Sequence, residues 1–99
     1  MLNISTEKNN KEAVISLEGR LDTTSSPELE KALPDILNGT ENLVFDLAKL
    51  DYISSAGLRV LLSVHKTMKK QGDMVIRNSS DDVKEVFEVT GFSDILNIE

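Results

Sequence analysis

Residues 42–62 of the chain read NLVFDLAKLDYISSAGLRVLL and predict three consecutive pieces of structure. Residues 42–47 form a short apolar run of β-type side chains, which predicts a buried strand, although its length alone also allows a helical piece. Residues 51–55 read as a connecting loop in which two serines are adjacent. From Leu58 onward, apolar residues recur at helical spacing. A buried strand that leads through a polar loop into an amphipathic helix is typical of a parallel α/β sheet.

The sequence before this stretch predicts a hairpin and a helix. Residues 2–6 and 13–17 alternate apolar and polar side chains, as strands with one buried face do, and a turn cluster separates them. Ser26 followed by Pro27 is a strong start signal for a helix, with Ser26 as the N-cap. The Asn-Gly pair at 38–39 supplies the stop.

The sequence after the stretch continues the alternation of strand and helix. Residues 74–76 form another short apolar run, which predicts a strand. The spacing Ser79-x-x-Asp82 resembles a capping box at the start of a further helix, and Gly91 is its expected end. The apolar residues at 95, 96 and 98 predict either a last helical turn or a short strand.

The complete order is strand, strand, helix, strand, helix, strand, helix. This order predicts a single α/β domain over residues 1–99, because 99 residues leave no room for a second domain. We expect a mixed, mostly parallel sheet of four to five strands with helices packed against it. The N-terminal hairpin contributes the antiparallel strand, and the later strands pair through right-handed crossovers.

Composition removes several classes of chemistry. The chain has no cysteine and one histidine, so disulfides, thiolate metal sites and histidine-rich relays are excluded. Seventeen acidic against eleven basic residues give a net charge of −6, which disfavours direct binding of nucleic acid or an anionic membrane. The apolar runs are too short to cross a bilayer, and the N-terminus lacks a signal-peptide pattern. We expect a cytoplasmic protein without membrane insertion, catalytic residues, bound metal or cofactor.

The two serines of the loop allow two interpretations. Ser54 or Ser55 can serve simply as the N-cap of the helix that follows. Alternatively, one of them accepts a phosphate, since the free N–H groups and the dipole of a helix N-terminus favour an anion. The small Ala56 and Gly57 leave those N–H groups accessible.

A family resemblance favours the second interpretation. Residues 45–62 resemble the signature of STAS domains, specifically the bacterial anti-sigma factor antagonists, and the match runs through FDL, YISSAGL and RVLL. Residues 17–22 (LEGRLD), 69–72 (KKQG) and 87–92 (FEVTGF) resemble other parts of the same family in the same order. The resemblance therefore covers nearly the whole chain.

The resemblance implies a regulator that binds a serine kinase, which is also an anti-sigma factor, and loses that partner when one serine is phosphorylated. The acceptor matches Ser55, and a PP2C-type phosphatase would reset it. Two positions depart from the family pattern: Ser54 stands where several members carry Asp, and Ala56 stands where Ser or Thr is frequent. The partner-binding residues that we expect are Asp22, Thr23, Ser54, Ser55, Ala56, Gly57, Leu58 and Arg59.

Some of these residues have an ordinary structural alternative. Asp22 matches the family's acidic loop residue, but it is equally an Asx cap near Thr24. Arg59 lies one turn into the helix, where it could contact a partner or a phosphate, or remain a solvated arginine. His65 lies on or beside the apolar helix face, and we expect a partly buried core residue rather than a catalyst.

Three other functions were weighed. Acyl carrier proteins are also small and acidic with one modified serine, but they are all-helical, whereas residues 13–17 and 43–47 predict strands. An enzyme would need paired titratable groups in a cleft, which a domain with one histidine hardly offers. The resemblance itself allows a further use of the fold, as a STAS accessory subunit of a lipid-transport ABC system or as a signalling scaffold that phosphorylation does not regulate.

Overall fold

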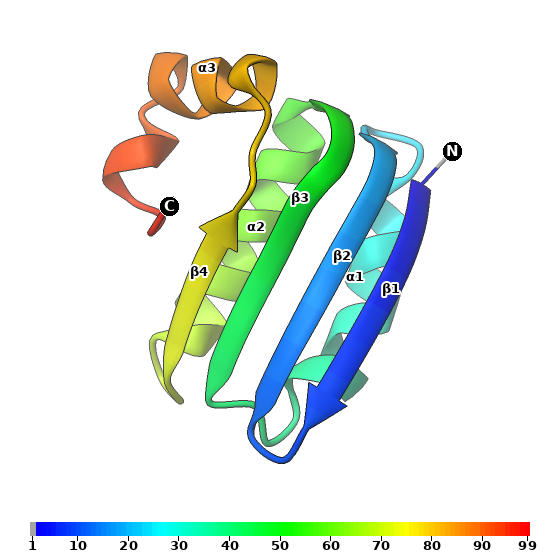
Figure 1. Cartoon of the computed structure of the whole chain (residues 1–99), viewed down its shortest axis with the longest axis vertical. Helices are drawn as coiled ribbons and strands as arrows, with labels where there is room; N and C mark the ends of the chain where they lie inside the picture. The colour runs from blue at the N-terminus through cyan, green and yellow to red at the C-terminus, as the bar shows by residue number, and fades with distance from the viewer. Residues whose placement is uncertain (1) are drawn as a thin grey trace.

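Four strands form one mixed sheet in the computed structural model, which describes residues 2–99. The strands β1 (Leu2–Asn9), β2 (Glu12–Leu21), β3 (Asn42–Ile53) and β4 (Asp73–Arg77) lie in the order β1-β2-β3-β4. β1 pairs antiparallel with β2, whereas β2, β3 and β4 are mutually parallel (Figure 1). The predicted hairpin, the mixed sheet and the α/β class are confirmed.

Two helices cover one face of this sheet. α1 (Ser26–Leu37) connects β2 to β3, and α2 (Ser55–Met68) connects β3 to β4; both lie behind the sheet in Figure 1. α3 (Asp81–Val89) packs against β3, and the short η1 (Phe92–Asp94) follows it. No helix within residues 2–99 is both long and apolar enough to span a bilayer.

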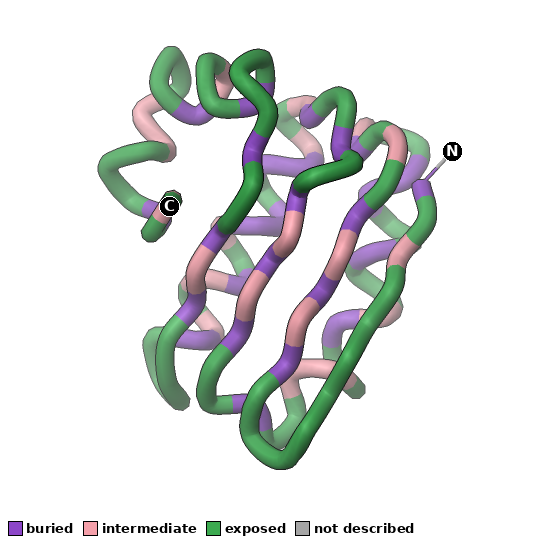
Figure 2. The backbone as a smooth tube through the Cα atoms, in the orientation of Figure 1, coloured by how far each residue is buried: buried purple, intermediate pink, exposed green. Residues whose placement is uncertain are grey.

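The core lies between the sheet and the two covering helices. Over residues 13–17 of β2 and 43–47 of β3 every second residue is buried, on the side that faces α1 and α2, and the purple segments of Figure 2 follow this pattern. Ile15, Phe45 and Leu47 are fully buried in this way. The opposite side of the same strands is only half-buried at Val14 and Val44. One face of the sheet is therefore free of covering helices.

Strand β3 is longer than the sequence predicted, which corrects the expected loop at residues 51–55. The strand continues to Ile53, and only Ser54 separates it from α2. The extension forms because Tyr52 pairs with Arg20 and Ile53 pairs with Leu21 on the parallel strand β2. The buried Ile53 side chain then adds to the core.

Two expected helix caps are also wrong by one residue. Ser25, not Ser26, is the N-cap of α1, and its hydroxyl donates to the Arg20 carbonyl at 2.7 Å instead of capping the helix. At α3 the cap is Ser80, whose Oγ accepts from the Val83 N–H at 3.2 Å. Ser79 lies one residue before this cap; it is buried, and its Oγ has no hydrogen-bond partner within residues 2–99.

Of the two alternatives for residues 95, 96 and 98, the strand occurs in part, and the helical turn lies just before these residues. Phe92–Asp94 forms one short 3-10 turn, after Gly91 at a φ of 81°. Ile98 then forms an isolated parallel bridge with Ile76 of β4. The Ile76 N–H donates to the Asn97 carbonyl at 2.9 Å, so the chain end lies along the edge of the sheet.

A lysine from β1 supplies the positive charge that the end of α1 lacks. The last turn of α1 contains no basic residue, and Lys8 Nζ donates to the carbonyls of Ile36, at 3.2 Å, and Asn38. We predict that Lys8→Met lowers the free energy of unfolding by about 0.5–1 kcal/mol, because the helix dipole loses its cation. Urea unfolding measures the change. Lys84→Met on α3 is the control, and an equal effect of both variants would contradict this role of Lys8.

Candidate functional site

The two serines at the start of α2 have different environments. Ser54 is the N-cap: its Oγ accepts a long hydrogen bond, 3.5 Å, from the Gly57 N–H. The Ser54 N–H donates to the Leu21 carbonyl at the end of β2, at 2.9 Å. Ser54 is half-buried, whereas Ser55, the first residue of the helix, is exposed. The ordinary capping role therefore falls to Ser54, and Ser55 is left facing solvent.

Gly57 lets α2 begin directly on the ends of two strands. A Cβ atom at this position would lie 2.8 Å from Leu21 Cγ and 2.9 Å from Ile53 Cγ1. Only a glycine accepts this approach without displacing buried side chains. Gly57 and Leu58 are both buried, so these two predicted site residues position the loop instead of presenting a surface. Ser55 and Arg59 are exposed, and Ala56 is half-buried.

The predicted acidic residue Asp22 organises its own loop. Its Oδ1 accepts hydrogen bonds from the N–H groups of Thr24 and Ser25, both at 3.0 Å, which confirms the Asx-cap interpretation. The Ser25 N–H above all holds the pKa of Asp22 below its ordinary value, because it stabilises the charged carboxylate. Thr23 is exposed at the tip of this loop. The Asp22 loop and the serine loop meet through Leu21, which accepts from Ser54.

The structure adds two residues to this end of the sheet that the sequence analysis missed. The guanidinium of Arg20 lies 4.2 Å from the centroid of the Tyr52 ring, a cation–π contact between register partners on β2 and β3. Tyr52 is 40% exposed. The contact could not be predicted from the sequence, because it depends on the pairing of two segments whose register is irregular between Gly19 and Arg20.

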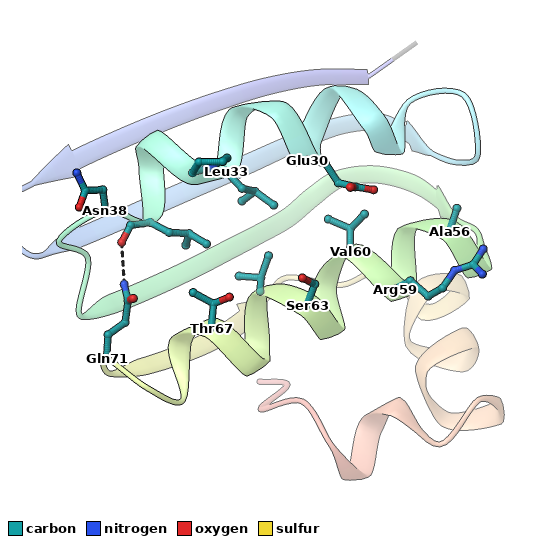
Figure 3. Close-up of a pocket in the computed structure, with 12 residues that line it drawn as sticks. Glu30, Leu33, Asn38, Ala56, Arg59, Val60, Ser63, Thr67 and Gln71 are labelled. Atoms are coloured by element: carbon teal, nitrogen blue, oxygen red, sulfur yellow. Dashed lines mark hydrogen bonds between the residues drawn. The ribbon is translucent and has the colours of Figure 1, made fainter.

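A groove runs along the outer side of the helix pair. Its volume is about 810 Å³, and it lies between α1 and α2. Leu33 and Val60 are buried in its floor, and Arg59 stands at the end near Ala56, toward which its side chain extends (Figure 3). At the other end of the groove, Gln71 links the segment after α2 to the end of α1: its Nε2 donates to the Leu37 carbonyl at 2.7 Å. Arg59 has no ion pair within residues 2–99 and so keeps a free positive charge near the serine loop.

The remaining candidates are structural. His65 is half-buried on α2, as expected for a residue at the edge of the core. Among the described residues, no three His, Cys, Asp or Glu side chains gather where they could hold a metal ion.

The protein is a small α/β domain with a serine loop at the start of α2, a mixed sheet that begins with a hairpin, and one sheet face without helices. The family model of the STAS domain matches residues 3–99, and the chain belongs to this family. The chain is 39% identical over 87 residues to BtrV of Bordetella bronchiseptica, a protein assigned as an anti-sigma factor antagonist, covering 86% of this chain and 75% of that protein. It is 30% identical over 99 residues to the anti-sigma-B factor antagonist of Staphylococcus aureus, and this match covers 98% of this chain and 92% of that protein.

Solved structures show the same fold. An anti-sigma factor antagonist from Mycobacterium paratuberculosis superposes with a TM-score of 0.89 at 20% identity, covering 99% of this chain and 85% of that chain. The antagonist SpoIIAA in its unphosphorylated form gives 0.84 at 18% identity, covering 98% and 88%. Its phosphorylated form, from Bacillus, gives 0.75 at 17% identity, covering 98% and 91%.

The close packing at Gly57 gives a direct test of how the loop is held. We predict that Gly57→Ala lowers the free energy of unfolding by about 1–3 kcal/mol, because the new methyl group displaces Leu21 and Ile53 in the core. Chemical denaturation measures the loss. Ser63→Ala, at an exposed position of the same helix, is the control and should change stability by less than about 0.5 kcal/mol. A Gly57→Ala protein as stable as this control would contradict the packing role.

Proposed function

We propose that this chain is an anti-sigma factor antagonist that binds a serine kinase/anti-sigma factor and is switched off by phosphorylation of Ser55. The single observation that carries the proposal is the exposed Ser55 hydroxyl at the first position of α2, beside a cap already supplied by Ser54. The names of the relatives support the antagonist role and favour it over an accessory role in lipid transport.

The geometry favours Ser55 over its neighbour as the phosphate acceptor. A kinase needs a serine whose Oγ can approach the γ-phosphorus of ATP. In the transfer, a bond forms between Oγ and that phosphorus, the bond to ADP breaks, and the hydroxyl proton passes to a base of the kinase. Ser54 is half-buried and its Oγ faces the Gly57 N–H, whereas Ser55 is exposed.

The start of α2 tolerates the added phosphate. Helix N-termini favour anions, and Arg59, four residues after Ser55, lies on the same side of the helix with its side chain extended toward Ala56. The modification adds about −1.5 to −2 charges to a chain of net charge −6. The fold then stays intact while the exposed surface changes in charge and bulk. Loss of the partner follows from that surface change, and a PP2C-type phosphatase in the cytoplasm would restore the bare hydroxyl.

The acceptor assignment can be tested by mass spectrometry. Incubation with the cognate serine kinase and ATP should add one phosphate, and fragmentation should place it on Ser55. Ser55→Ala should abolish the modification, because the exposed hydroxyl is gone.

Ser54→Ala is the matched control, since it removes the neighbouring hydroxyl. It should lower stability by about 1 kcal/mol through the lost cap, yet still accept phosphate at position 55. Phosphate on Ser54 in the unaltered protein would overturn the assignment. A kinase that neither binds nor modifies the chain would overturn the proposed function as a whole.

A further inference from the structure

The serine loop itself offers little surface for tight binding. Ser55 and Ala56 have small side chains, Gly57 and Leu58 are buried, and Arg59 is the one large exposed side chain among the expected partner-binding residues. Protein interfaces draw most of their affinity from a few large anchors, in which tyrosine, tryptophan and arginine are enriched. If the loop is a docking site, as the proposed function requires, its anchors must come from the elements beside it.

Besides Arg59, two further large side chains are exposed close to the loop, Arg20 and Tyr52. They are register partners on β2 and β3, and the next pair along the strands is Leu21 with Ile53. The Leu21 carbonyl accepts the Ser54 N–H at 2.9 Å, so one continuous stretch of paired backbone connects the Arg20–Tyr52 contact to the serine loop. The two features therefore keep a fixed relation to each other.

The Arg20–Tyr52 pair is also preorganised for binding. The ring lies under the guanidinium at 4.2 Å, and Arg20 Nε lies 3.9 Å from Asp22 Oδ2. Asp22 is fixed in turn by the N–H groups of its own loop. The Arg20 side chain remains 54% exposed and Tyr52 40% exposed. Groups that are held in place but still exposed lose little conformational entropy on binding, which favours affinity.

We propose that the Arg20–Tyr52 pair anchors the serine kinase/anti-sigma factor on this chain. The inference rests on the proposed function and extends the docking surface from the serine loop onto the uncovered face of the sheet. The partner presents a carboxylate to the free edge of the Arg20 guanidinium and an apolar group to the Tyr52 ring, since a guanidinium binds carboxylates in a planar fork. Two other large apolar residues are exposed, and neither lies on β2 or β3: Val89 is the last residue of α3, and Ile95 follows η1.

The test is the dissociation constant of the unphosphorylated chain for its cognate kinase, measured by titration calorimetry. Tyr52→Ala and Arg20→Ala should each raise Kd about 30-fold or more, the threshold of an interface anchor. The double variant should weaken binding by less than the product of the two effects, because either substitution already breaks the stacked pair. Val89→Ala and Arg77→Ala, matched truncations elsewhere on the surface, should change Kd less than about twofold.

The outcomes separate this inference from the proposed function. If the unaltered chain binds the kinase and is phosphorylated on Ser55, but both anchor variants bind within twofold of it, the Arg20–Tyr52 anchor is overturned alone. If the unaltered chain does not bind at all, the proposed function has failed. Circular dichroism checks that each variant is folded; should Tyr52→Ala unfold, Tyr52→Leu and Arg20→Gln decide by the same Kd criterion.

Discussion

The parallel pairing of β2 with β3, continued into the hydrogen bond from Ser54 N–H to the Leu21 carbonyl, is the constraint on which the site depends. It brings the ends of two strands to one edge of the sheet, where α2 starts. Gly57 then allows the helix to begin directly on Leu21 and Ile53. The helix start is held by Ser54, which is the N-cap, and by Gly57 and Leu58, which are buried. Ser55 takes part in neither role and is exposed to solvent.

This construction would allow the proposed phosphorylation of Ser55 to act without refolding the protein. The loop is held by paired backbone, by the Ser54 cap and by buried apolar contacts, and within residues 2–99 none of these involves the Ser55 hydroxyl. A phosphate on Ser55 would change only the surface that a partner contacts, by adding about −1.5 to −2 charges near Arg59 and extra bulk. Salt screens the charge within about 8–10 Å, so the effect is local to the docking surface. The overall charge of −6 contributes little by comparison.

The sequence was enough to predict the fold because each element carries its own signal. The alternation in β2, the apolar face of α2 and the glycine after α3 all predicted the correct element. What it missed depends on contacts between distant segments. The extension of β3 to Ile53 requires pairing with β2, and the Arg20–Tyr52 contact requires a register that shifts twice along those strands. The positions of the two caps depend on tertiary contacts in the same way: Ser25 Oγ donates to the Arg20 carbonyl of β2, and Ser79 is buried while the cap Ser80 is exposed.

We propose that phosphorylation alters the surface around Ser55 and leaves the pairing of β2 with β3 intact. Amide spectra of the labelled protein before and after phosphorylation measure this most directly. We expect shift changes confined to the serine loop, the first turn of α2 and the adjoining Asp22 loop, with amide exchange of Ser54 unchanged and kinase binding lost. Large shifts through β2 and β3, or fast exchange of the Ser54 N–H in the phosphorylated protein, would contradict it.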